Sequence, residues 1–340
     1  MALKKTKIFA TLFISSFAIL TPSILKAENT NLSLSLPIDC EPNKTCFIQN
    51  YVDIDPSDKI KDYSCNNSTY DGHKGVDIRL LSVAKAKEGV SVLASAPGVV
   101  KVIRDGMVDK LITDLNNPYI KNRQCGNGVV IDHGDGWETQ YCHMQQGSLL
   151  VKKGEEIKRG QRLGNVGFSG EAQFAHIHLS VRKNGKVIDP FLGDKTNSSC
   201  STNTKNENTL WDKKAIDSLK YQEGSLLQSG FITAPINTAI VENGELPPQP
   251  NSISAKAIVF YSRFINLRKG DKISFEITGP LGIFSSNITK PLEKNKAQYV
   301  AYSGKKRPKE GFAQGEYIAY VKLLREGKAI IYKEQTMKLK

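Results

Sequence analysis

Short apolar runs separated by glycine-containing turns dominate residues 72–193. The runs are rich in β-branched residues, and each is as short as a typical β-strand. Their regular spacing predicts an antiparallel β-sheet. Glycine turns at residues 133–136 and 184–185 join neighbouring runs and favour hairpins. The strand candidates in this region span residues 90–93, 98–103, 128–131 and 158–166.

A second β pattern occupies residues 251–340, where apolar and polar positions alternate along several runs. Such alternation is typical of strands with one buried face, and we expect a small β-sandwich of the immunoglobulin-like type. The fold class is therefore mainly β. The runs span residues 257–267, 271–277, 297–302, 316–324 and 329–333.

Residues 194–250 are expected to be a linker between the two β domains. The polar, low-complexity stretch at residues 194–209 opens it, and a proline-rich segment at residues 246–250 ends it. Apolar side chains at helical spacing predict a short helix at residues 210–219. Residues 28–71 are polar and rich in Asn, Asp and Ser, so we expect a loop-rich lead-in there.

Residues 1–27 have the layout of a secretory signal peptide. Lys4, Lys5 and Lys7 precede an apolar stretch at residues 8–20 that is too short to span a bilayer. We therefore expect an exported protein, periplasmic or secreted, with no stable membrane span after signal removal. The cleavage site stays open, because Leu25 is larger than the residue usually found at its position before a cut.

The chain contains six cysteines, and an even number in an exported chain favours disulfides. Cys40 and Cys46 could close a small loop, but spacing alone leaves all 15 pairings open. Thiolate metal ligands are disfavoured, since no C-x-x-C pair is present. The six are Cys40, Cys46, Cys65, Cys125, Cys142 and Cys200.

Positive charge is concentrated in the C-terminal β domain. Without residues 1–27 the chain holds 43 Lys and Arg against 34 Asp and Glu, and residues 251–340 alone hold 18 against 7. A basic domain favours an anionic partner. An exported protein meets envelope polymers before nucleic acid, so we expect no nucleic-acid partner and consider docking to an anionic envelope polymer. The candidate side chains are Lys305, Lys306, Arg307 and Lys309.

Four of the five histidines fall in three short segments, GHKGVD, QYCHM and FAHIHL. Residues two or four apart share a face of a strand, so His73 and Asp77 would lie together, as would His176 and His178. Two such strands side by side could present His73, Asp77 and His178 to one metal ion. His143 would stand nearby.

Two imidazoles and one carboxylate with an open position are typical of catalytic zinc, and we expect one zinc ion per chain. Iron in an oxygenase uses a similar set and stays an alternative. The helical H-E-x-x-H motif is excluded, because Lys74 and Asp77 stand where it needs Glu and His. Bound zinc lowers the pKa of its water to about 7, and a histidine is the natural proton acceptor. His133, in a glycine turn, favours a structural role.

These segments resemble the lysostaphin-type, or LytM-like, zinc peptidases, which cleave cross-bridges or stem peptides of bacterial peptidoglycan. The resemblance spans about residues 73–191 and includes the stretches at 92–103, 126–144 and 151–170. It implies an antiparallel sheet with an open groove. It further implies the zinc ligands His73, Asp77 and His178, with His143 and His176 as general base and transition-state stabiliser. Phe174 and Ala175 replace the Gly-Pro of many members and reshape one groove wall.

The expected function is a zinc-dependent endopeptidase acting on peptidoglycan peptides. One alternative is a non-catalytic regulator that activates other cell-wall hydrolases, although such forms lose ligands or catalytic histidines. Another keeps hydrolysis but changes the substrate to a glycine-rich protein. The bond cleaved, autoinhibition and the oligomeric state stay open at this point.

Overall fold

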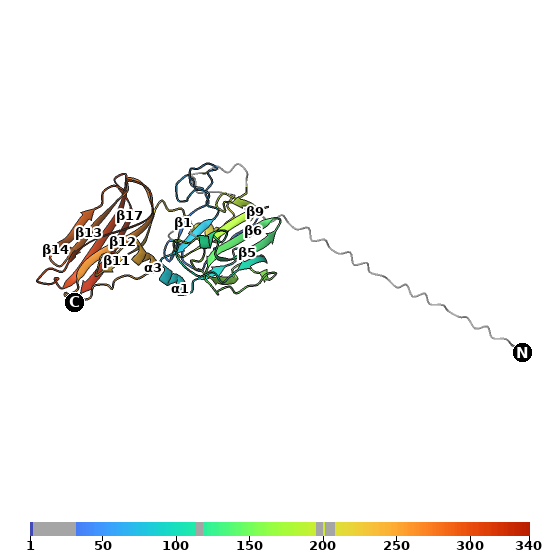
Figure 1. Cartoon of the computed structure of the whole chain (residues 1–340), viewed down its shortest axis with the longest axis horizontal. Coiled ribbons are helices and arrows are strands. Elements are labelled where there is room, and N and C mark those ends of the chain that lie inside the picture. The colour runs from blue at the N-terminus through green and yellow to red at the C-terminus, as the bar shows by residue number, and fades with distance from the viewer. Residues whose placement is uncertain (3–31, 113–117, 195–199, 201–207) are drawn as a thin grey trace. The chain divides into compact units, whose positions relative to one another are not determined.

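A computed structural model describes residues 1–2, 32–112, 118–194, 200 and 208–340 (Figure 1). The predicted signal peptide therefore lies almost wholly outside the described residues. So does most of the polar stretch at residues 194–209.

An eight-stranded antiparallel sheet occupies the first half of the described chain and confirms the antiparallel prediction. Its main order is β1-β2-β9-β6-β5-β4-β7, with β10 pairing to β9. Consecutive sheet neighbours β2 and β9 are about a hundred residues apart in sequence. The strands are β1 (Cys46–Asn50), β2 (Val76–Leu80), β4 (Gly98–Arg104), β5 (Asn127–Gly134), β6 (Trp137–Met144), β7 (Glu156–Ile157), β9 (His176–Lys183) and β10 (Lys186–Ile188).

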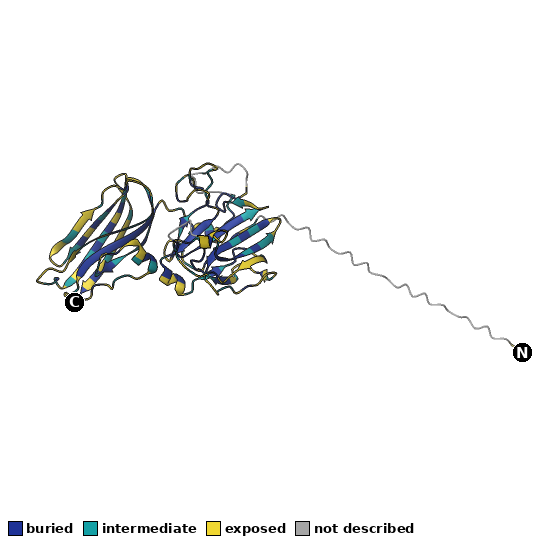
Figure 2. Ribbon diagram, in the orientation of Figure 1, coloured by how far each residue is buried: buried dark blue, intermediate teal, exposed yellow. Residues whose placement is uncertain are grey.

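The hydrophobic core of the first domain packs against this sheet, whose strands contain many buried residues (Figure 2). Ile78 of β2, Ile177 of β9 and Val129 of β5 are almost fully buried in it. The two-stranded sheet of β3 (Ser91–Leu93) and β8 (Arg162–Asn165) adds Val92 and Leu163 to the same core. Because strand side chains alternate, the opposite face of β2 and β9 is left for polar residues.

The C-terminal part is a β-sandwich of two antiparallel sheets. Phe260 and Phe264 from one sheet share a core with Phe275 and Val321 from the other. One sheet contains β11 (Ser225–Ile232), β12 (Ala257–Leu267) and β15 (Lys296–Lys306); the other contains β14 (Gly282–Ile288), β13 (Lys272–Gly279), β16 (Gly315–Arg325) and β17 (Lys328–Leu339). Strand β11 lies inside the range predicted as linker, and its pairing with β12 makes it part of the sandwich.

The helices are short. They are α1 (Val83–Lys87), α2 (Lys213–Ser218) and α3 (Thr238–Asn243), with a 3-10 turn at Pro118–Ile120. The predicted helix at residues 210–219 corresponds to α2, where Asp212 accepts a hydrogen bond from the backbone of Ala215 as its N-cap. No helix within the described ranges has the length and apolar character to cross a bilayer.

All six cysteines form disulfides, which resolves the pairing that spacing left open. Cys40 pairs with Cys46, Cys65 with Cys200, and Cys125 with Cys142. The Cys65–Cys200 bond spans 135 residues and ties the lead-in to the start of the linker region. In the Cys125–Cys142 bond, Cys142 directly precedes His143 in the sequence.

A buried ionic cluster connects β2 with the C-terminal residues. Arg79 of β2 donates to both carboxylate oxygens of Glu242 in α3, at 3.0 and 2.8 Å. Arg263 of β12 forms an ion pair with the same carboxylate. All three side chains are buried, so their mutual pairing compensates much of the cost of removing charge from water.

Candidate metal centre

His73 lies in the loop just before β2, not in the strand as predicted. Backbone contacts hold it there: its N–H donates to Tyr70, and its carbonyl accepts from the N–H of Asp53 at 2.9 Å. Its Nδ1 lies 2.6 Å from the carbonyl oxygen of Tyr51. The lead-in therefore positions this histidine, and strand alternation plays no part in bringing it next to Asp77.

Asp77 and His178 are directly opposite each other on the antiparallel pair β2 and β9. Oδ1 of Asp77 lies 2.8 Å from Nδ1 of His178. His73 completes the group, with its Nε2 3.2 Å from Oδ2 of Asp77 and 3.2 Å from Nδ1 of His178. The three side chains form a cluster that could hold a metal ion.

These separations fit tetrahedral zinc. Ligand atoms about 2.0–2.1 Å from a tetrahedral ion lie about 3.3 Å from one another. Here the two nitrogens are 3.2 Å apart, and with one oxygen of Asp77 the three ligand atoms lie within 4.8 Å of one another. The donor set of two imidazoles and one carboxylate is also that of catalytic zinc. His73 and Asp77 are almost fully buried, whereas the His178 side chain is 15% exposed, so the cluster is open on the His178 side.

Hydrogen bonds also fix which nitrogen each histidine presents. A carbonyl oxygen only accepts, so Nδ1 of His73 carries a proton and Nε2 is the ring nitrogen that faces Asp77. For His178 the order is reversed. Ser180 donates its hydroxyl to the carbonyl of Lys74 at 2.8 Å, so its oxygen accepts from Nε2–H of His178 at 2.9 Å and leaves Nδ1 as the ligand atom. Such partners orient metal-binding histidines.

Gly75 makes room for the His178 ring. A Cβ at position 75 would stand 2.5 Å from Nε2 of His178 and 2.7 Å from the carbonyl oxygen of Leu179. Real Cβ atoms do not approach this closely, so a larger residue would displace the ring or the strand. The glycine in HKGVD thus has a steric role in shaping the cluster.

The Asp77 carboxylate has a further partner in Asn50 of β1, whose Nδ2 donates to Oδ2 at 2.8 Å. Burial alone would raise the pKa of Asp77, but His73, His176 and His178 hold it well below its usual value. Burial lowers the pKa of His73, and the charge of Asp77 outweighs that effect and raises it. The cluster therefore favours an ionised carboxylate that attracts a cation.

His143 lies near the end of β6 with a φ of 62°, which is unusual for a residue other than glycine. Its N–H donates to the carbonyl of Cys125 at 2.8 Å, and its own carbonyl accepts from Gly167 at 3.0 Å. Its Nδ1 donates to the carbonyl of Ser169 at 2.8 Å, so Nε2 keeps a lone pair. Strain of this kind is typical of functional sites.

His176 lies beside His143, with the two ring centroids 4.5 Å apart, and His178 lies 5.9 Å from His143. Nδ1 of His176 donates to the carbonyl of Phe174 at 2.8 Å. Burial lowers the pKa of both His143 and His176, and neighbouring histidines lower both further. The structure thus brings together all five predicted site residues.

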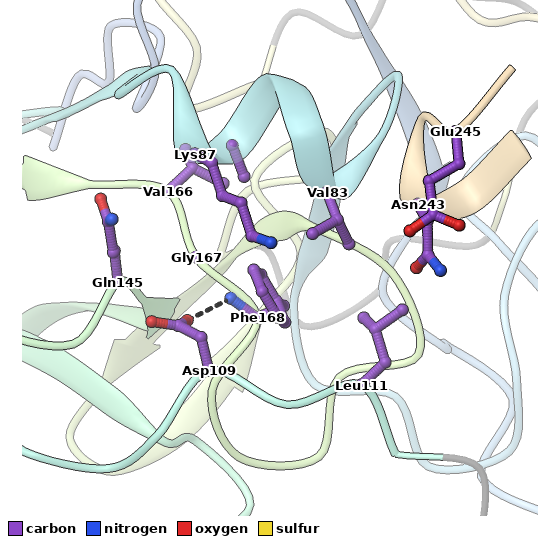
Figure 3. Close-up of a pocket in the computed structure, with 11 residues that line it drawn as sticks. Val83, Lys87, Asp109, Leu111, Gln145, Val166, Gly167, Phe168, Asn243 and Glu245 are labelled. Carbon is purple, nitrogen blue, oxygen red and sulfur yellow. Dashed lines mark hydrogen bonds between the residues drawn. The ribbon is translucent and has the colours of Figure 1, made fainter. Parts of the chain in front are cut away.

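Asp109 supports the loop that holds His143. Its Oδ1 accepts from the N–H of Phe168 and its Oδ2 from that of Gln146, both at 2.8 Å. Figure 3 shows this carboxylate beside Gly167 and Phe168, at the edge of a recess of about 420 Å³ that α1 and α3 border on the other side. Asp109 therefore fixes the Gly167 N–H that bonds to the His143 carbonyl.

Several supporting residues were missed by the sequence analysis: Asn50, Tyr70, Arg79, Phe174 as a ring partner, and Ser180. Tyr70 lies 4.4 Å from His73 between ring centroids. The Phe174 ring lies 4.4 Å from that of His176. Arg79 follows Asp77 by two residues and Ser180 follows His178 by two, so the period of a strand was a signal for both. His133 is held by Pro97 and Thr139, in agreement with a structural role.

Residues 71–190 of the chain match Peptidase family M23. The chain thus contains a Peptidase M23 domain of the LytM type, as the sequence resemblance predicted. The match covers the loop of His73 and strands β2 to β10, and all five site residues lie within it.

Among curated proteins, the chain is similar to the peptidoglycan DD-endopeptidase ShyA of Vibrio cholerae, at 29% identity over 41% of this chain and 28% of that protein. ShyB of the same organism, also a peptidoglycan DD-endopeptidase, is 33% identical over 25% of this chain and 18% of its own length. The murein hydrolase activator NlpD of Escherichia coli is 26% identical over 35% of this chain and 25% of its length.

The chain therefore spans less than a third of the length of these relatives. Among solved structures, the catalytic domain of a prophage-encoded M23 protein from Enterococcus faecalis is 21% identical. That similarity covers 47% of this chain and 95% of that chain, with a TM-score of 0.31.

Proposed function

We propose that the protein is an exported zinc-dependent endopeptidase that hydrolyses peptide bonds in the cross-links or stem peptides of peptidoglycan. One observation carries the proposal: the ligand atoms of His73, Asp77 and His178 lie within 4.8 Å of one another, beside the rings of His143 and His176. The names of the Vibrio cholerae relatives support the substrate class.

Zinc held by His73, Asp77 and His178 would acidify a bound water and polarise the peptide carbonyl. The chain itself supplies the proton transfer. His143 and His176 each donate Nδ1–H to a backbone carbonyl, so each has an Nε2 lone pair to accept a proton. We assign this pair two roles: taking the proton of the attacking water, and stabilising the transition state while returning a proton to the leaving amine.

The test is digestion of purified sacculi by the mature protein, with mass spectrometry of the released peptides. New amino and carboxyl termini are expected from the wild type. They should be absent with a zinc chelator and with His143→Ala, while His143→Ala keeps its zinc. His133→Gln is the matched control, because His133 lies outside the cluster and should leave cleavage intact. Cleavage by His143→Ala at the wild-type rate would remove this residue from the mechanism.

A second candidate function is a non-catalytic activator of other cell-wall hydrolases, as the name of NlpD describes for that relative. All five expected ligand and catalytic residues are present in this chain, whereas non-catalytic forms lose some of them, and this favours catalysis. The sacculus assay separates the two functions: an activator releases nothing alone but accelerates a second hydrolase added to the same sacculi. A glycine-rich protein substrate is tested by replacing the sacculi with that polymer.

The C-terminal sandwich is proposed to dock to an anionic envelope polymer. Lys305, Lys306 and Lys309 are exposed at the end of β15 and in the loop after it. Exposed charges are screened by salt, so binding to sacculi should weaken as sodium chloride rises. A triple Lys→Gln variant at these positions should lose the salt dependence.

The proposed export is supported by the pairing of every cysteine, because disulfides persist outside the cytoplasm.

A further inference from the structure

Strand β14 is an outer strand of the C-terminal sandwich (Figure 1). It pairs with β13 on one side, and no described strand pairs with its other side. The N–H of Thr289, just after β14, donates to the carbonyl of Ile273 at 2.9 Å. Alternate residues of an antiparallel pair turn their backbone groups to the same neighbour, so Ser286 and Ile288 turn theirs away from β13. These groups form a free edge on which another strand can pair.

The sequence of β14 does not protect this edge. Edge strands of natural proteins are commonly protected from further pairing by charged side chains or proline. Residues 281–289, which contain β14, include neither. Strand β17, at the opposite edge of the same sheet, contains Lys328, Lys333, Glu334 and Lys338. The edge of β14 is therefore the less protected of the two.

Apolar side chains lie beside the free edge. Ile283 is 72% exposed and Ile288 is 52% exposed. The two lie on one face of the sheet, because their partners on β13, Thr278 and Ser274, are four residues apart. An added strand places its side chains about 4.5–5.5 Å from those of its neighbour, and apolar pairs at this distance stabilise a sheet. The face therefore favours a strand with apolar residues at alternate positions.

The charge around β14 is positive. Nζ of Lys305 on β15 lies 5.5 Å from the centroid of the Phe284 ring. Lys290 follows the strand and is exposed, and residues 277–292 contain no acidic residue. This charge favours a partner strand with acidic ends. It disfavours a second copy of this chain, because residues 251–340 hold 18 basic residues against 7 acidic ones.

We propose that the free edge of β14 binds an extended, acidic peptide segment of a protein partner by adding it to the sheet as a further strand. The backbone groups of Ser286 and Ile288 hydrogen-bond the segment, as in other cases of strand addition. Ile283 and Ile288 contact its apolar side chains, and the lysines near β14 contact its acidic ones. The C-terminal domain thereby recruits a protein, and this role does not depend on the proposed peptidase function.

The test measures binding of the fluorescein-labelled peptide Glu-Thr-Val-Thr-Val-Thr-Glu to the mature protein by fluorescence anisotropy. The protein carries His143→Ala, so that the proposed catalytic site does not cleave the probe. One control peptide replaces both valines by proline, which keeps the charge but prevents strand pairing; another replaces both glutamates by lysine. The probe should bind about tenfold or more tightly than either control. Equal binding of the probe and either control, or no binding of the probe, would overturn the proposal.

Two pairs of variants place the binding on β14. Ser286→Pro removes an outward N–H and no hydrogen bond to β13, so binding should weaken about fivefold to tenfold. Ser286→Ala keeps that N–H and should bind as the parent does. Ile288→Glu keeps every backbone group and should weaken binding by repelling the acidic probe, whereas Thr336→Glu, an equal change on exposed β17, should not. Parental binding by both Ser286→Pro and Ile288→Glu overturns the assignment to β14.

Amide hydrogen exchange, followed by NMR, locates the added strand directly. The N–H groups of Ser286 and Ile288 should exchange more slowly when the probe is bound, because each then donates a hydrogen bond. Unchanged exchange at both positions would overturn the pairing. Sedimentation of the free protein tests the other occupant: a dimer that Ser286→Pro abolishes would assign the edge to a second copy of the chain and overturn the acidic partner.

Discussion

Asp77 and His178 face each other across two antiparallel strands, with Oδ1 of the carboxylate 2.8 Å from Nδ1 of the imidazole. Nε2–H of the same imidazole donates to Ser180, so the nitrogen that faces Asp77 is the one with a lone pair. The nitrogen and the carboxylate are therefore placed to bind the same cation. The relationship therefore supports a metal site more directly than the presence of histidines alone.

Asp77→Asn should lose metal. The amide keeps the shape of the side chain but removes the charge that offsets the ion. Even partners outside the ligand set change metal affinity about 10–100-fold, so a loss of more than about 100-fold is expected here. Zinc content after dialysis against graded chelator measures it. Asp71→Asn, an exposed change in the preceding loop, is the control. Full zinc retention in Asp77→Asn would contradict the ligand assignment.

Gly75→Ala should weaken zinc binding although it replaces none of the proposed ligands. The added Cβ would stand 2.5 Å from Nε2 of His178, so the ring must move and the contact with Ser180 must break. The expected loss is about 10–100-fold in affinity, measured by the same chelator competition. Lys74→Ala changes the exposed neighbour and should keep wild-type affinity. An unaffected Gly75→Ala would show that the ring position is not critical.

The strand-borne part of the site could be predicted from sequence. His176 and His178 alternate with buried Ile177 and Leu179, and period two places both histidines on one face. His73 could not be placed in this way, because its position depends on contacts with Tyr51 and Asp53 in the lead-in. The strand that was expected to bring His73 to Asp77 begins only at Val76.

Contacts between residues that are far apart in the chain could not be predicted from the sequence either. The buried cluster joins Arg79 to Glu242 and Arg263, which lie more than 150 residues away, and no local pattern predicts such a pairing. Strand β11 lies in the range that was expected to be a linker, and only the fold shows that it pairs with β12. The cysteine pairing likewise needed the fold, since spacing allowed 15 arrangements.

Loss of the Cys125–Cys142 disulfide should reduce catalysis more than zinc binding. The bond fixes Cys125, whose carbonyl accepts the N–H of His143 and helps hold its positive φ. A double Cys→Ser variant at these positions should lose stability, about 3 kcal/mol for a loop of this length, and show a lower kcat with unchanged zinc content. The Cys40, Cys46 double Ser variant is the matched control. Equal kcat in both variants would argue against a positioning role.

Glu242→Gln should destabilise the fold strongly. It leaves Arg79 and Arg263 buried without their shared counter-ion, and breaking a buried pair from one side typically costs about 3–5 kcal/mol. Urea denaturation measures the change. Glu88→Gln removes an exposed partner of Lys85 and should cost less than about 1 kcal/mol. If both variants unfold at the same urea concentration, the cluster adds little to stability.

Asp189 should make the fold less stable as the pH rises toward neutrality. Burial, with a smaller effect from the charge of Asp62, raises its pKa to about 7, and its Oδ2 has no hydrogen-bond partner among the described residues. The native state therefore binds the proton more tightly than the unfolded chain, whose carboxyl titrates near 3.8. This contribution to stability is complete below about pH 3.8 and is lost as the pH rises to about 7, at roughly 1.4 kcal/mol for each pKa unit of difference.

Asp189→Asn should remove this dependence, seen as a flatter profile of unfolding free energy against pH. Asp217→Asn, on exposed α2, should keep the wild-type slope, and an unchanged slope in Asp189→Asn would assign the dependence to another group.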